Sequence, residues 1–242
     1  MKINREAVEN SRLANFLKKY WIPILAVIVV ITVIASSVGI YREEVLHIDP
    51  DVQYEEGDKL YFSASALDTL NPVVSQSSDT YYISKLIYDS LFDYTDEFNV
   101  TGELADSYEV DTEKAKIDIT LKSGIKWHNG DSLTASDVRF TVSAIKSYGS
   151  KSIYYEKVSK IYSVQVTGEL KLTIYFRNNT DCALDNLIFP ILPAGEYYSA
   201  GSLIRDVSDF KPVGTGKYVY KSYDSLKELK LTPNESYFGA KA

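Results

Sequence analysis

The most informative part of this sequence is Gly124-Ile125-Lys126-Trp127-His128-Asn129-Gly130-Asp131-Ser132-Leu133-Thr134-Ala135-Ser136-Asp137-Val138. We expect Trp127 to fill the core beneath the turn that follows it, and Gly130 to permit a tight or left-handed backbone in that turn. Thr134 and Asp137 have the spacing of a capping box, with Asp in place of the usual Glu or Gln. The stretch therefore predicts a turn and then a helix, and apolar spacing predicts that the helix buries a stripe formed by Val138, Val142 and Ile145.

Strand signals lie on both sides of this stretch. Residues 117–121 place Ile and Leu at every second position, which predicts a half-buried strand. A hairpin is predicted across residues 163–176, and we expect Gly168 to supply the positive φ of its turn. A second hairpin is predicted across residues 218–232, around Asp224-Ser225.

The segment before these strands is expected to begin with a β-prone run at residues 59–63, followed by a loop over residues 64–79. Asp79 is a plausible N-cap for a helix. The apolar face of this helix falls on helical spacing at Ile83, Leu86, Ile87, Ser90 and Leu91. Further on, residues 96–99 predict a turn and Asp181 can cap a short helix that runs through Phe189. Strands mixed with helices and hairpins indicate a mixed α/β lobe.

Composition excludes several classes of protein. The chain has 242 residues, 45% of them apolar, which is enough for a packed core. Its net charge of −7 and the lack of a Lys/Arg cluster in the soluble part argue against a nucleic-acid partner. A single cysteine, Cys182, excludes an internal disulfide and a thiolate metal cluster, and we expect it to be a buried, inert thiol.

Residues 21–40 carry no charge and are long enough, as a helix, to cross about 30 Å of hydrocarbon. Basic side chains precede this run and acidic ones follow it, so we expect residues 1–20 in the cytoplasm. Residues 41–58 are acidic and polar and are interpreted as a stalk, which places residues 59–242 outside the cell membrane. The competing interpretation is a cleavable signal peptide, for which Ala35-Ser36-Ser37 is a passable cleavage site. We favour a single-pass, uncleaved signal-anchor helix.

Five motifs occur in a fixed order along the chain, at residues 86–92, 102–108, 124–138, 212–216 and 234–239. With these motifs the chain resembles the N-terminal part of the family 5 solute-binding proteins, which serve ABC importers of oligopeptides, dipeptides and nickel. The resemblance runs from about Lys59 to the last residue and implies a periplasmic-binding-protein-like II fold. Members of the family are longer, so the resemblance implies an incomplete fold in which only the first lobe is present and the chain is truncated.

The resemblance also implies where a ligand would bind. In peptide-binding members an extended peptide pairs with a segment just after a Leu-x-Pro element, which here is Leu70-Asn71-Pro72. This places Gln76, Ser77 and Ser78 on the ligand-binding segment, for polar or main-chain pairing. A second contact is an aromatic residue that forms a wall of the cleft, and the matching position is Tyr154. The alternative role for Tyr154 is ordinary packing.

No catalytic set is evident in the sequence. The only histidines are His47, in the expected stalk, and His128, so a metal site is not expected. No Gly-x-Ser-x-Gly elbow occurs. We therefore expect a non-enzymatic, membrane-anchored substrate-binding component of an ABC importer, without a cofactor, whose partners are a peptide or other small solute and the permease subunits. The alternatives are an extracytoplasmic sensor or adaptor of the same fold, and a secreted hydrolase.

Overall fold

The computed structural model describes residues 61–65, 67–181, 183–199, 202–203, 210–224 and 227–240. The described residues from Phe62 onward belong to one compact unit. The predicted cytoplasmic segment, signal anchor and stalk, at residues 1–20, 21–40 and 41–58, lie outside the described residues, as does Cys182. Among the residues that are described, no helix has both the length and the apolar composition to span a bilayer.

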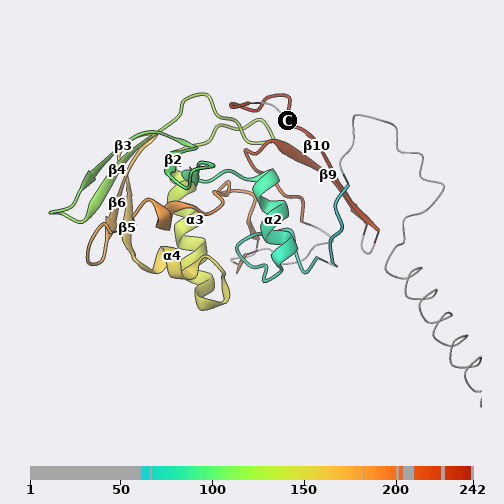
Figure 1. Ribbon diagram of the computed structural model, residues 1–242, viewed down its shortest axis with the longest axis horizontal. Coiled ribbons are helices and arrows are strands. Elements are labelled where there is room, and N and C mark those ends of the chain that lie inside the picture. Colours follow the sequence, from blue (N-terminus) through green and yellow to red (C-terminus); the bar gives the residue numbers. More distant parts are fainter. Residues whose placement is uncertain are drawn as a thin grey trace, which may run out of the picture. The chain divides into compact units, whose positions relative to one another are not determined.

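The largest sheet is antiparallel, with the strand order β3-β4-β6-β5 (Figure 1). Its strands are β3 (Ala105–Asp111), β4 (Lys116–Leu121), β5 (Ile161–Val166) and β6 (Lys171–Phe176). In β4, Ile117, Ile119 and Leu121 are buried, because alternate side chains of a strand point to the same face. The predicted half-buried strand and the hairpin β5–β6 are confirmed.

Gly168 does not have the positive φ that the sequence led us to expect. The loop between β5 and β6 spans four residues. It is closed by bonds from the Thr167 and Gly168 N–H groups to the Lys171 carbonyl oxygen, at 2.9 and 3.1 Å. A loop of this length does not need the left-handed residue that a two-residue turn requires.

Helix α2 (Ser78–Ile87) begins earlier than predicted. Its N-cap is Ser77, whose hydroxyl accepts bonds from the backbone N–H groups of Asp79 and Thr80. Asp79 instead accepts bonds from the backbone N–H and the hydroxyl of Ser65. The helix ends at Ile87 because Tyr88 is extended, so Ser90 and Leu91 lie beyond it, contrary to the prediction.

Helix α3 (Ala135–Tyr148) has the predicted N-terminus and buried stripe. The Asp137 carboxylate accepts bonds from the Thr134 backbone N–H at 2.8 Å and from the Thr134 hydroxyl at 2.9 Å. Its other oxygen accepts a bond from the Ala194 N–H at 2.9 Å. One buried carboxylate therefore caps α3 and ties it to a segment almost sixty residues further along the chain.

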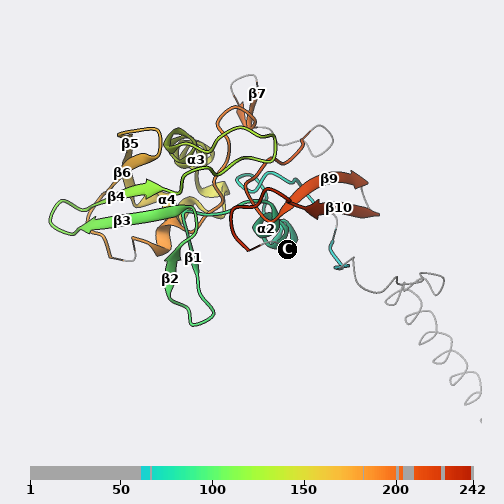
Figure 2. The ribbon, with the colours of Figure 1, turned by 90° about the horizontal axis from the view of Figure 1, so that it is seen from above.

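The remaining elements are short. Hairpin β1–β2 extends away from the large sheet, and hairpin β9–β10 lies at the other end of the unit (Figure 2). The helix predicted from Asp181 through Phe189 is reduced to the single turn η2, and residues 61–63 of the predicted first strand are exposed and irregular. The bounds are β1 (Phe92–Tyr94), β2 (Val100–Gly102), η1 (Gly149–Lys151), α4 (Tyr155–Ser159), η2 (Asp185–Leu187), β7 (Tyr198–Ser199), β8 (Ser202–Leu203), β9 (Tyr218–Asp224) and β10 (Glu228–Pro233).

Two of the sequence motifs meet at the end of α2. The His128 backbone N–H donates to the Gly214 carbonyl, and the Gly214 N–H donates to His128 Nδ1 at 3.2 Å. His128 Nε2 then donates to the Gly216 carbonyl at 3.0 Å, so the ring is the neutral Nε2–H tautomer. Gly214 and Gly216 approach Ile87 so closely that a Cβ on Gly214 would lie 1.8 Å from the Ile87 oxygen. As predicted, Trp127 is buried, and Gly130 has a φ of 93°.

Candidate functional site

The predicted binding segment leads into the first turn of α2. Gln76 is exposed, and its backbone N–H donates to Asp68 Oδ2 at 2.8 Å. Ser77 caps the helix, and Ser78 is its exposed first residue. The Ser78 N–H is one of the first N–H groups of a helix, which have no partner within the helix. No hydrogen bond from this N–H is found within the described part of the chain.

Asp68 holds this segment in place. Its carboxylate accepts bonds from the Ser75 hydroxyl at 2.6 Å and from the backbone N–H groups of Gln76 and Thr69, each at 2.8 Å. Burial alone would raise the pKa of Asp68, but these hydrogen bonds outweigh it and hold the pKa below its usual value. The backbone before α2 is therefore fixed without any bound ligand.

Two contacts bring the segment beside the loop that follows α3. Gln76 Nε2 donates to the Lys151 carbonyl at 3.3 Å, and the Tyr148 hydroxyl donates to the Val74 carbonyl at 3.4 Å. Tyr154 lies at the end of this loop, so the structure places the predicted residues in one region. Their role in binding a solute stays a prediction.

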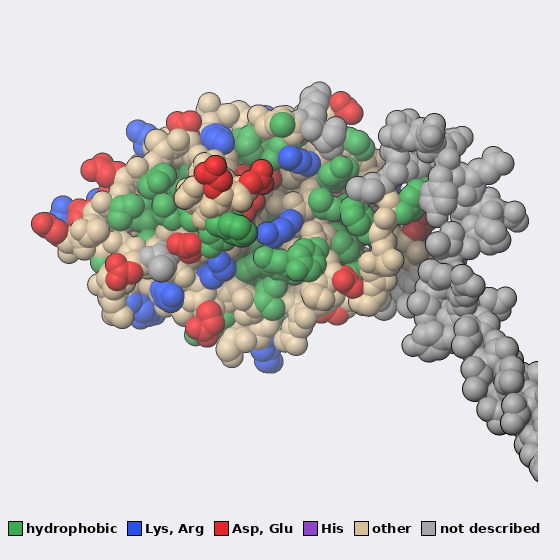
Figure 3. All heavy atoms as spheres, in the orientation of Figure 1, with side chains coloured by type: hydrophobic (Ala, Val, Ile, Leu, Met, Phe, Trp, Pro, Cys, Tyr) green, Lys and Arg blue, Asp and Glu red, His purple; other side chains and the backbone are tan. Residues whose placement is uncertain are grey.

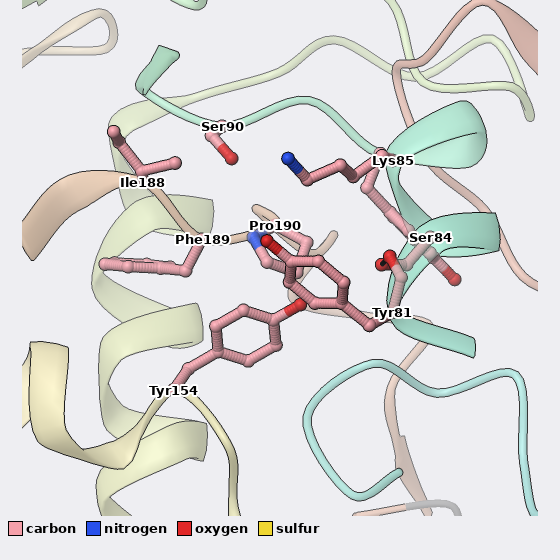
Figure 4. A pocket seen from close by; sticks show the side chains of 9 residues that line it. Tyr81, Ser84, Lys85, Ser90, Tyr154, Ile188, Phe189 and Pro190 are labelled. Carbon is pink, nitrogen blue, oxygen red and sulfur yellow. Dashed lines mark hydrogen bonds between the residues drawn. The ribbon is translucent and has the colours of Figure 1, made fainter. Parts of the chain in front are cut away.

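Tyr154 is 4% exposed and packs with its ring centroid 6.4 Å from that of Tyr81. Burial raises the pKa of the Tyr154 hydroxyl, which hydrogen-bonds the Ser84 side chain. The residue is thus well packed, and it also forms one wall of a cavity of about 30 Å³ (Figure 4). The cavity is lined by Tyr81, Ser84, Lys85, Tyr88, Ser90, Tyr154, Ile188, Phe189 and Pro190.

Three residues of this cavity that were not predicted lie on α2. Tyr81, Ser84 and Lys85 are spaced at i, i+3 and i+4, the pattern that places side chains on one face of a helix. The sequence therefore carried a signal for this polar and aromatic face, beside the apolar face that was used for the prediction. Around α2, hydrophobic side chains gather on the surface with Lys or Arg side chains among them (Figure 3).

Two neighbouring carboxyl groups, the buried Asp89 and the half-buried Glu103, lie next to Ser90 of the cavity lining. Asp89 accepts bonds from the Thr215 hydroxyl at 2.7 Å and from the Tyr237 hydroxyl at 3.3 Å. Glu103 accepts the Ser90 N–H at 2.8 Å. Burial, and then repulsion from Asp89, raises the pKa of Glu103 to about 8, and burial also raises the pKa of Asp89. The described residues contain no group of His, Cys, Asp and Glu arranged to hold a metal ion.

Comparison with known proteins gives one family. The family described as "Bacterial extracellular solute-binding proteins, family 5 Middle" matches residues 99–242, more than half of the chain. The chain is 27% identical over 187 residues to the oligopeptide-binding protein AppA of Bacillus subtilis, covering 75% of this chain and 34% of AppA. It is 22% identical over 185 residues to the glutathione-binding protein GsiB of Pectobacterium atrosepticum, covering 76% of this chain and 35% of GsiB. The chain thus spans about a third of the length of the curated relatives it matches.

Solved structures agree on the fold. AppA of Bacillus subtilis in complex with a nonapeptide has a TM-score of 0.61 at 26% identity, with coverage of 74% of this chain and 36% of AppA. NikA from Brucella suis in complex with Fe(III)-EDTA has a TM-score of 0.66 at 21% identity, with coverage of 76% and 37%. The predicted periplasmic-binding-protein-like II fold is therefore confirmed for the part of the chain that these structures cover.

Proposed function

Because the chain belongs to family 5 of the bacterial extracellular solute-binding proteins, we propose that it is the substrate-binding component of an ABC importer and that its solute is a peptide. The peptide as solute is supported by the likeness to AppA, which is named an oligopeptide-binding protein and has been solved with a nonapeptide. Such a protein binds its solute and releases it unchanged, so this proposal requires neither a cofactor nor a catalytic residue.

One observation carries the proposal, namely a fixed and exposed stretch of backbone next to exposed hydrophobic side chains. Gln76 and Ser78 are exposed, and the Ser78 N–H has no partner among the described residues. Close by, Tyr82 of α2 is 67% exposed and Ile153 is 46% exposed. An extended peptide pairs its main chain with such a segment, while side chains of the peptide contact the neighbouring apolar surface. In this proposal Tyr154 supports the surface from below as a wall of the cleft.

Proline substitution at Ser78 tests the main-chain pairing. Proline lacks the N–H group, and it is well tolerated at the first position of a helix. Ser77 is already extended, with φ −80° and ψ 132°, which suits a residue before proline. Ser78→Pro thus removes one donor while it keeps the helix, and Ser78→Ala is the matched control that retains the N–H.

The measurement is retention of a mixed pool of short peptides by the full chain in mild detergent, read by mass spectrometry. We expect the wild type and Ser78→Ala to retain peptides. Ser78→Pro should bind the same peptides about fivefold more weakly, which is the contribution of one backbone hydrogen bond. Equal retention by the two variants would contradict the proposed main-chain pairing. A wild type that retains no peptide would contradict the proposal that the solute is a peptide.

We also propose that residues 21–40 anchor the protein in the cell membrane, with residues 1–20 in the cytoplasm. Residues 41–58 then form a stalk, and residues 59–242 form the first lobe of an extracytoplasmic solute-binding domain. This domain works with permease subunits. The uncharged run and the asymmetry of charge around it support this arrangement. Protease added to intact cells should digest the domain and leave a membrane-bound N-terminal fragment. Release of the domain into the medium without protease would favour a cleaved signal peptide.

A further inference from the structure

Lys85 is a cation at the mouth of the cavity between α2 and the segment 188–190. It lies in the last turn of α2 and is exposed, and its ammonium group lies 5.3 Å from the centroid of the Tyr81 ring. None of the ion pairs found among the described residues includes Lys85. The ring contact holds the side chain over the opening without neutralising its charge.

The groups around Lys85 suit a small anion. In Figure 4 the Lys85 ammonium and the Ser90 hydroxyl point toward one another across the opening, and the Tyr81 hydroxyl points into the same space. Ile188 and Phe189 form an apolar wall. A cavity of about 30 Å³ has room for about two water molecules, and the two oxygens of a carboxylate are of comparable size.

A second cation lies nearby. Lys157 of α4 donates from its ammonium to the Asp185 carbonyl at 2.8 Å. Burial lowers the pKa of Lys157, the Asp185 carboxylate opposes this shift, and repulsion from Lys85 and Lys160 adds smaller contributions to it. Asp185 therefore offsets the charge of Lys157, and an anion bound beside Lys85 would reduce the repulsion that remains between the two lysines.

We infer that Lys85 is a specificity-determining residue that binds a carboxylate group of the solute at the mouth of this cavity, an inference that rests on the proposed solute-binding function. The Lys85 ammonium supplies a charge-assisted hydrogen bond, and the hydroxyl groups of Ser90 and Tyr81 donate to the carboxylate oxygens. The wall at Ile188 and Phe189 contacts the apolar part of the solute next to the carboxylate.

The first experiment tests the anion site without any peptide. The full chain, with its lysines converted to ¹³C-dimethyl-lysine, is titrated with N-acetyl-leucine and, separately, with N-acetyl-leucinamide, and the methyl resonances are followed by NMR. The Lys85 resonance is identified by its loss in Lys85→Met. Lys122 is the internal control, because its ammonium lies 5.5 Å from the centroid of the Phe238 ring in a similar contact. We expect the Lys85 resonance to shift saturably with the acid and not with the amide, while the Lys122 resonance stays in place.

The second experiment measures retention of a pool of short peptides prepared as free acids and as C-terminal amides. The wild type and Lys122→Met should retain the acids about tenfold more tightly than the amides, and Lys85→Met should lose this preference. Amides retained only when they contain Asp or Glu would assign the carboxylate to a side chain of the peptide.

The two experiments separate the inference from the proposed function. Peptides that bind equally as acids and amides would support the peptide as solute and overturn the role of Lys85. A saturable shift of the Lys85 resonance in a protein that retains no peptide would support the carboxylate site and contradict the proposal that the solute is a peptide. Equal shifts of the Lys85 and Lys122 resonances would show unspecific ion pairing and overturn the site.

Discussion

Replacement of Asp137 by Asn tests whether one buried carboxylate joins α3 to the segment around Ala194. The Asp137 side chain is 7% exposed and accepts three hydrogen bonds, two from Thr134 and one from Ala194. Asn has the same shape but only one oxygen, so its amide group must face either the Thr134 N–H or the Ala194 N–H. In either orientation, a charge-assisted bond is lost and a backbone donor faces another donor.

The size of the effect follows from these contacts. A hydrogen bond to a charged group contributes about 1.5–3 kcal/mol, and leaving a buried donor without an acceptor adds about 1 kcal/mol or more. We therefore expect Asp137→Asn to lower the free energy of unfolding by about 2–4 kcal/mol. The assay is urea unfolding of the full chain, followed by circular dichroism.

Asp96→Asn is the matched control, because Asp96 lies exposed in the turn between β1 and β2. It should change the free energy of unfolding by less than about 0.5 kcal/mol. An Asp137→Asn variant as stable as this control would show that neither the cap nor the link to Ala194 depends on the second carboxylate oxygen.

Three further predictions concern the packing around the end of α2. Gly214→Ala should lower the free energy of unfolding by about 3 kcal/mol or more in urea titrations, because its Cβ would lie 1.8 Å from the Ile87 oxygen; a stable variant would mean that this close approach does not exist. Glu103 has a folded-state pKa of about 8, above its usual 4.5, so it favours folding below about pH 4.5 and this contribution is lost as the pH rises through 8. Glu103→Gln stays neutral and should lose less stability than the wild type between about pH 4.5 and pH 8 in thermal melts; parallel curves would show that Glu103 is ionised in the fold. Burial lowers the pKa of His128 below 6.5, so the wild type should lose stability as the pH falls below about 6.5, where the unfolded chain takes up the proton first, and His128→Gln should lack that component.

Local sequence signals predicted the elements that local contacts determine. Thr134 and Asp137 stand three residues apart, and the capping box forms between them. The alternation around Ile119 needs no more than a sheet with one buried face. Where two local solutions competed, the prediction was wrong. Ser77 and Asp79 are both good N-cap residues. Ser77 caps the helix, while the Asp79 carboxylate accepts hydrogen bonds from Ser65, which lies fourteen residues earlier in the chain.

In the candidate site, too, the sequence predicts what local spacing determines and does not predict what long-range contacts determine. The face of α2 that carries Tyr81 and Lys85 can be read from helical spacing, although the cavity beside it cannot. Its far wall is brought into place by the bridge between Ser90 and Pro190, a contact across a hundred residues. No periodicity in the sequence reports such a contact, because it depends on how the whole unit packs.

Hydrogen–deuterium exchange of the full chain, with and without a pool of short peptides, tests whether the protein binds peptides at the segment that leads into α2. The proposed function predicts that peptides slow the exchange of amides in residues 76–85 and 151–157, the two segments that the structure brings together, and leave hairpin β9–β10 unchanged. Peptides that bind without slowing exchange in either segment, or that slow it only elsewhere, would contradict peptide binding at these two segments.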